Sequence, residues 1–147
     1  MFRLSHPSEP PVTLSPTSTI RSSAPSRGRS ISSWTLRGLL ASVFIAAGGA
    51  KLAGVPMMVE IFAQIGLGQG FRYLTGIVEF IGGLWLFVPG MTALAALWLA
   101  ATMVGAILAH LLVLPESGMP AAVLLALSLV LVWLHRDQLV AMKARVG

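Results

Sequence analysis

Long apolar stretches, separated by short turn-forming segments, dominate the chain from residue 34 onward. About 20 residues are needed for a helix to cross the hydrocarbon core of a bilayer, so this pattern predicts four membrane spans. Pro89-Gly90 and the segment Pro115 to Gly118 are tight breakers that predict antiparallel neighbours. The predicted fold class is therefore all-α, an integral membrane four-helix bundle. The four runs cover residues 34–53, 71–88, 91–114 and 119–134.

A longer connection, residues 54–70, joins the first two runs and has a pattern of its own. Pro56 is suited to the first turn of a helix, and five apolar residues then recur at helical spacing opposite Glu60 and Gln64. The pattern predicts a short helix between spans one and two. Such a helix either lies in the membrane interface or folds onto the outer end of the bundle. Its apolar residues are Met57, Met58, Ile61, Phe62 and Ile65.

The two ends of the chain differ from the apolar runs. Residues 1–32 are rich in serine, proline and arginine and have no apolar period, which predicts a disordered tail. A transit peptide and an extension from an upstream start codon are the alternatives. Residues 33–136 form the predicted membrane domain, and residues 137–147 a short basic tail. Because most basic residues flank the first and last spans, both termini are expected in the cytoplasm of a bacterium, with the domain in its inner membrane.

Composition supports a membrane protein and excludes several kinds of chemistry. The chain is 56% hydrophobic and only 10% charged, which is more apolar side chain than a soluble domain of 147 residues can bury. The net charge of +5 lies mostly outside the apolar runs and indicates orientation, not nucleic-acid binding. There is no cysteine, so disulfides, thiolate ligands and thiol catalysis are excluded on this chain. The ligands for a metal site are not clustered either, so none is predicted.

Three ionisable residues interrupt the apolar pattern near the predicted outer side. Glu79 lies roughly 12 Å below the outer boundary, His110 roughly 6 Å and Lys51 roughly 3 Å, at 1.5 Å per helical residue. An ionisable group inside the membrane usually marks a functional site, so the three residues are candidates for a polar intramembrane site that binds a ligand, a proton or a quinone. A structural explanation stays open for each. Glu79 can be a buried clamp between helices, His110 a hydrogen-bonded bundle residue, and Lys51 an interfacial anchor.

Rows of small residues lie near Glu79 and near His110 in the sequence. Gly76, Gly82 and Gly83 lie three or four positions from Glu79, and a second row follows the third span at Ala101, Gly105 and Ala109. Rows of small residues allow membrane helices to approach closely. Both rows are therefore predicted to pack helices together, with Glu79 pointing into the bundle.

The order of these features resembles the DoxX/DoxD superfamily of membrane proteins over residues 36–136. The segment KLAGVPMMVEIFAQIGLGQGFRYLTGIVEFIGGLWLFVPG contains Lys-Leu after a small-residue span, F-x-x-I-G-L, and Y-x-x-G-x-x-E-x-x-G-G leading to Pro-Gly. M-x-x-A-x-x-x-H, from Met103 to His110, resembles the third span of that family. The resemblance implies a four-helix bacterial membrane protein. Some relatives are membrane subunits of sulfur-compound:quinone oxidoreductases, and others support redox enzymes.

Three classes of function remain open at this point. The chain is expected to be a membrane subunit of, or accessory to, a quinone-linked redox system, with quinone as the suggested cofactor, rather than an enzyme that is sufficient by itself. A small transporter with an outward cavity is the first alternative, and a structural scaffold is the second. The expected partners are the lipid bilayer and a redox-enzyme subunit, with further copies of this chain as an alternative and no nucleic acid.

Overall fold

Six helices make up the described part of the chain, residues 27–146, in the computed structural model. Side chains are described for residues 31–145. The all-α prediction is confirmed, and each of the four predicted apolar runs is helical over most of its length. The helices are α1 (Arg27–Ala53), α2 (Pro56–Ile65), α3 (Gln69–Trp85), α4 (Thr92–Leu112), α5 (Met119–Leu134) and α6 (Arg136–Val146).

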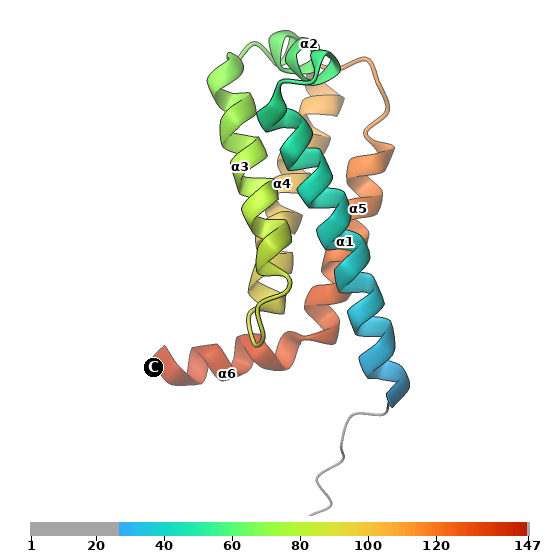
Figure 1. Cartoon of the computed structure of the whole chain (residues 1–147), viewed down its shortest axis with the longest axis vertical. Helices are drawn as coiled ribbons and strands as arrows, with labels where there is room; N and C mark the ends of the chain where they lie inside the picture. Colours follow the sequence, from blue (N-terminus) through green and yellow to red (C-terminus); the bar gives the residue numbers. More distant parts are fainter. Residues whose placement is uncertain (1–26, 147) are drawn as a thin grey trace, which may run out of the picture.

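Four of the helices lie side by side along the long axis of the molecule, and the other two lie across its ends (Figure 1). α1 packs against α3 and α5, and α4 packs against the same two helices. The short α2, which begins at Pro56 as predicted, lies across one end. α6 lies across the other end and points away from the long helices. We refer to these as the α2 end and the α6 end.

The number of candidate membrane spans is smaller than the sequence pattern predicted. By length and composition, two described helical segments can cross a bilayer, Ile31–Ala53 of α1 and Thr92–Leu112 of α4. A third span results if α5 and α6, which are bent by 60° at their junction, count as one broken span. α3 has only 17 residues, including a buried arginine and a buried glutamate, and is shorter than a straight span requires. The described helices therefore provide two to three candidate spans instead of four.

Both chain ends differ from the expected tails. α1 begins at Arg27, before the predicted start of the first span, and residues 1–26 of the predicted tail lie outside the described residues. The predicted short tail, residues 137–147, is helical up to Val146 and belongs to α6, which begins at Arg136. The backbone N–H of Ala93 donates a hydrogen bond to Oε1 of Gln138, which joins α6 to the start of α4. This bond satisfies one of the free N–H groups of the first turn of α4, a contact that the apolar pattern cannot reveal.

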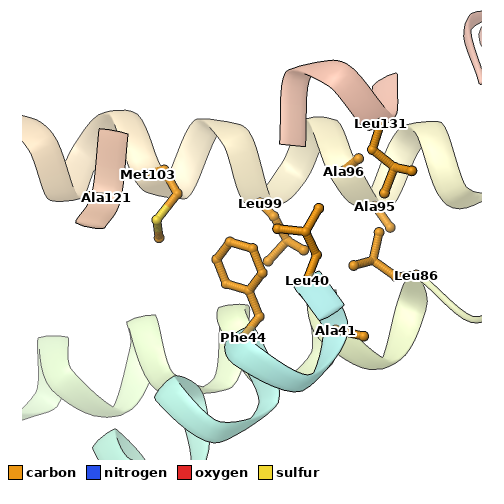
Figure 2. Packing of buried hydrophobic residues seen from close by; sticks show 10 residues of the cluster. All are labelled: Leu40, Ala41, Phe44, Leu86, Ala95, Ala96, Leu99, Met103, Ala121 and Leu131. Carbon is orange, nitrogen blue, oxygen red and sulfur yellow. The ribbon is translucent and has the colours of Figure 1, made fainter. Parts of the chain in front are cut away.

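A close-packed apolar cluster lies mostly in the half of the molecule nearer α6, and Ala121, in the first turn of α5, extends it toward the cavity (Figure 2). Large side chains fill it, and Phe44, Leu99 and Leu131 are completely buried. Beside it, the rings of Trp85 and Trp98 pack edge to face, 6.3 Å apart, between α3 and α4. The members of the cluster are Leu40, Ala41, Phe44, Leu86, Ala95, Ala96, Leu99, Met103, Ala121 and Leu131.

Arg37, a buried residue of α1, closes the end of α3 in this half. Its Nε and Nη2 donate to the backbone oxygen of Leu86, at 3.0 and 2.6 Å. Leu86 is the C-terminal cap of α3, and its carbonyl has no partner within the helix. The positive charge of the guanidinium is also favourable at a helix C-terminus. Arg37 therefore fixes the position of α1 along α3.

Glycine contacts hold α1 and α3 together along their length. A Cβ at Gly48 would lie 2.7 Å from the backbone oxygen of Gly76 and 2.7 Å from the backbone nitrogen of Phe80. A Cβ at Gly83 would lie 3.1 Å from the backbone oxygen of Ala41. Only a residue without a side chain allows two helix backbones to approach this closely. The close approach brings the side chains of the last turn of α1 next to the middle of α3.

Candidate functional site

A cavity of about 510 Å³ lies within the α2 end of the molecule. Residues from α1, α2, α3, α4 and α5 line it, and most of them are apolar. α2 covers it with Met58, Ile61, Phe62 and Ile65. Phe44 and Met103 belong both to the cavity wall and to the apolar cluster, so the cavity ends where the packed core begins.

Lys51 and Glu79 form an ion pair in the wall of this cavity. Nζ of Lys51 donates to Oε2 of Glu79 at 2.6 Å, and the two side chains are 14% and 4% exposed. The pair joins the last turn of α1 to the middle of α3. Gly76 allows this geometry, because a Cβ there would lie 3.0 Å from the Cβ of Lys51. A buried charge requires a partner of opposite sign, and each of these two residues supplies it for the other.

Arg72 binds the backbone of Lys51 and thereby holds the ion pair in position. It is 4% exposed, and its Nη1 donates to the backbone oxygen of Lys51, near the C-terminus of α1. Its Nε donates to Oε1 of Gln69 at 2.7 Å, and Nε2 of Gln69 donates to the backbone oxygen of Val59 in α2 at 3.1 Å. These bonds connect α3 to α2 and to the backbone of Lys51 in α1.

His110 lines the same cavity from α4 but belongs to a different set of contacts. Its Nδ1 lies 3.1 Å from the backbone oxygen of Glu116, in the connection to α5. Since a carbonyl oxygen only accepts, Nδ1 carries a proton in this contact. Among the described residues, no hydrogen bond joins His110 to the ion pair. The structure therefore brings Lys51 and Glu79 into direct contact and places His110 at the same cavity without contact.

The two predicted rows of small residues lie in different surroundings. Gly76, Gly82 and Gly83 are buried, and a Cβ at any of the three would lie within about 3 Å of an atom in α1 or α4. Ala101 and Gly105 are exposed and Ala109 is half-buried, and all three line the cavity. The space around a Cβ at Gly105 is open to 4 Å. The α3 row thus lies at helix contacts, whereas the α4 row lies at the rim of the cavity.

Sequence reasoning missed two residues that shape this site. Arg72 lies seven positions before Glu79 and therefore on the same helix face. Gly48 was not considered, although it lies one turn before Lys51 within a run of small residues. In both cases helical spacing from a polar residue was the available signal. Helical spacing shows which residues share a helix face, but it does not show which other helix packs against that face.

Comparisons with known proteins give one positive result. The sequence model of the DoxX-like family matches residues 35–133, which is more than half of the chain. No curated protein and no solved structure matches the chain significantly. In addition, the described residues contain no group of three or more His, Asp or Glu side chains that could hold a metal ion.

Proposed function

The chain belongs to the DoxX-like family of membrane proteins, and from that premise we propose that it is a membrane subunit of, or accessory to, a quinone-linked redox system. In this proposal it holds a quinone in the cavity at the α2 end. One observation carries the proposal. An ion pair and a histidine, Lys51, Glu79 and His110, meet in one apolar cavity of about 510 Å³.

The composition of the cavity wall fits a quinone head. Its volume lies within the range of about 300–1,000 Å³ that is typical of small-molecule sites, and such sites combine apolar walls with a few polar groups. A bound quinone accepts electrons and protons. The ammonium of Lys51 is a donor for a quinone oxygen. Because Nδ1 of His110 donates to the backbone oxygen of Glu116, Nε2 of the neutral ring is an acceptor for the hydroxyl of the reduced quinone, and the carboxyl group of Glu79 can hold or release a proton. The chain contains no cysteine, so a partner subunit would supply the electrons through its own centres.

For the membrane we propose four spans, α1, α3, α4 and α5, arranged as a bundle, with both termini on the cytoplasmic side of a bacterial inner membrane. The beginning of α1 and the whole of α6 lie at the same end of the molecule, and α6 carries Arg136, Lys143 and Arg145 (Figure 1). Basic residues concentrate on the cytoplasmic side. α3 then crosses a locally thinned bilayer, with its flanking residues extended toward the surface.

Arginine–aromatic pairs at both ends support this placement. At the α6 end, Arg37 lies over the ring of Trp34 at 4.3 Å, and Arg136 lies over that of Trp133 at 5.4 Å. At the α2 end, Arg72 lies 4.2 Å from the ring of Tyr73. Aromatic and basic side chains of this kind collect at membrane–water interfaces.

The packed core argues against the alternative of a transport pathway. Phe44 and Met103 close the cavity toward the apolar cluster, so the cavity does not continue through the half of the molecule nearer α6. A transporter would require this cluster to separate during each cycle, whereas a binding subunit functions with the core intact. The test below also distinguishes the proposed binding role from transport and from a purely structural role.

The test is to extract the tagged protein with its surrounding lipid from the native membrane and to measure bound quinone and co-purifying proteins by mass spectrometry. Quinone at about one per chain, together with an oxidoreductase subunit, is expected. Glu79→Gln and Lys51→Met should lose most of the quinone. Glu60→Gln is the matched control, because this carboxylate on α2 is exposed and does not line the cavity. Wild-type protein without quinone or partner would overturn the proposal, and solute flux in liposomes that contain this chain alone would favour transport.

A further inference from the structure

The cavity at the α2 end reaches the lateral surface of the molecule between α3 and α4. Three of its lining residues are exposed on that side: Leu74, which is 56% exposed, Ala101 and Gly105. A Cβ at Gly105 would meet no atom within 4 Å. The cavity is therefore open along this part of the boundary between the two helices, which we call the α3–α4 seam.

The same seam is closed nearer the α6 end. A Cβ at Gly82 would lie 2.6 Å from Cδ2 of Leu99, and the rings of Trp85 and Trp98 pack across the seam at 6.3 Å. The opening is thus confined to the half of the seam that borders the cavity. In the proposed four-span arrangement both α3 and α4 lie in the bilayer, so this opening faces lipid acyl chains and not water.

The ion pair of the cavity lies away from the opening. Lys51 and Glu79 join α1 to α3, and Lys51 extends from the helix on the far side of α3 from the seam. Proceeding from the ion pair to the seam, the wall consists of Thr75 and Val78 of α3 and of alanine, glycine and threonine side chains of α4. The inner wall carries the ion pair, whereas the wall toward the lateral opening is uncharged, and the hydroxyls of its two threonines donate to carbonyls of their own helices.

We infer that the α3–α4 seam is a lateral portal that holds the apolar tail of the ligand. The inference rests on the proposed function and adds the class of ligand: an amphiphile whose ring binds at the Lys51–Glu79 pair and whose long isoprenoid tail passes out between α3 and α4 into the bilayer. A ligand of this class reaches the site from the membrane without crossing the α2 cover. The exposed small residues Ala101 and Gly105 provide the width that a hydrocarbon chain needs, which is why this row lies at the rim of the cavity instead of in a helix contact.

The portal is tested by narrowing it without altering the polar groups. The variant is the double substitution Ala101→Leu and Gly105→Leu, and the matched control is Gly49→Leu, because Gly49 also has open space at its Cβ but does not line the cavity. The proteins are placed in nanodiscs, and binding is measured for ubiquinone with a long isoprenoid tail and for the ring-only analogue without a tail. Thermal unfolding of each protein verifies that the variants are folded.

Wild type and Gly49→Leu are expected to bind both compounds. The double variant is expected to retain the ring-only analogue and to bind the long-tailed quinone at least about tenfold more weakly, because the added side chains occupy the path of the tail. If the double variant binds both compounds as wild type does, or loses both equally, the portal is overturned while the proposed function stands. If wild type binds neither compound, the proposed function fails and the tail assignment fails with it.

Discussion

The two halves of this molecule use the same long helices in opposite ways. Near α6, buried side chains of α1, α4 and α5, together with Leu86 at the end of α3, fill the space between the helices. Near α2, the same helices present smaller side chains, such as Ala47, Ala106 and Ala109, and enclose about 510 Å³ of open space. The small residues in the cavity wall contribute to this difference, because they leave space that larger side chains would occupy.

Polar groups follow the same division. In the solid half, buried Arg37 binds a backbone oxygen and completes a helix end. In the hollow half, Lys51, Glu79 and His110 border open space. A buried polar group that is fully bonded to the protein stabilises the fold, whereas one that borders a cavity is accessible to a ligand. This contrast explains why the hollow half is the candidate site.

The largest effect is expected from a truncation in the solid half. Leu99→Ala should lower the free energy of unfolding by about 3 kcal/mol, because a completely buried side chain in a packed cluster leaves a void. Leu74→Ala, in the cavity wall and 56% exposed, should cost under about 1 kcal/mol, since it only enlarges existing space. Denaturant titration in micelles, followed by tryptophan fluorescence, measures both. Equal losses would contradict the division into a solid and a hollow half.

A somewhat smaller loss is expected where α1 touches α3. Gly48→Ala should lower the free energy of unfolding by about 2 kcal/mol, because its methyl group would collide with backbone atoms that cannot rotate away. Gly49→Ala is the control, since the neighbouring position is open. The same titration applies. If the two alanine variants unfold at the same denaturant concentration, the close backbone approach at Gly48 is not present in solution.

The ion pair should behave as a coupled unit. Lys51→Met alone should lower the free energy of unfolding by about 1 to 2 kcal/mol, because it leaves the buried carboxyl group of Glu79 without its partner. The double variant with Glu79→Gln should recover part of that loss. A double-mutant cycle at constant pH measures the coupling. Additive losses would mean that the two side chains are not paired.

The smallest effect is expected at the rim of the cavity. Gly105→Ala should raise the free energy of unfolding by about 0.5 kcal/mol, because alanine favours the helical backbone and the space at this position is open. Thermal unfolding in nanodiscs resolves a shift of this size when it is compared with wild type in parallel. A clear loss of stability would show that the rim is packed against another surface, such as a second copy of the chain.

The sequence predicted the helices well because membrane helices have a strong local signal. The four apolar runs and the Pro56 helix are all present. Only two to three candidate spans satisfy the length and composition of a membrane helix, because α3 and α5 are short, at 17 and 16 residues, and the pattern alone does not show where a helix ends near a membrane surface. α6 was missed because its sequence has no strong apolar period to separate it from a tail.

The candidate site was predictable as a set of residues but not as an arrangement. Lys51 and Glu79 are separated by 28 positions, and nothing in the sequence states that they form an ion pair. The α4 row of small residues matched the pattern of a helix contact, yet Gly105 faces open space. A small residue permits either close packing or a hollow, and only the size of the opposing side chains decides between the two.

The bonds of the α1–α3 pair also bear on how the chain is assembled in the membrane. Arg37 bonds to Leu86, Arg72 bonds to Lys51, and Lys51 bonds to Glu79, so all three contacts lie within residues 37–86. Because synthesis proceeds from the N-terminus, this hairpin can satisfy its buried charges before α4 leaves the ribosome. α4 and α5 would then be inserted beside an α1–α3 pair whose contacts are already formed. The cavity would form last, as the space that α4 and α5 leave unfilled.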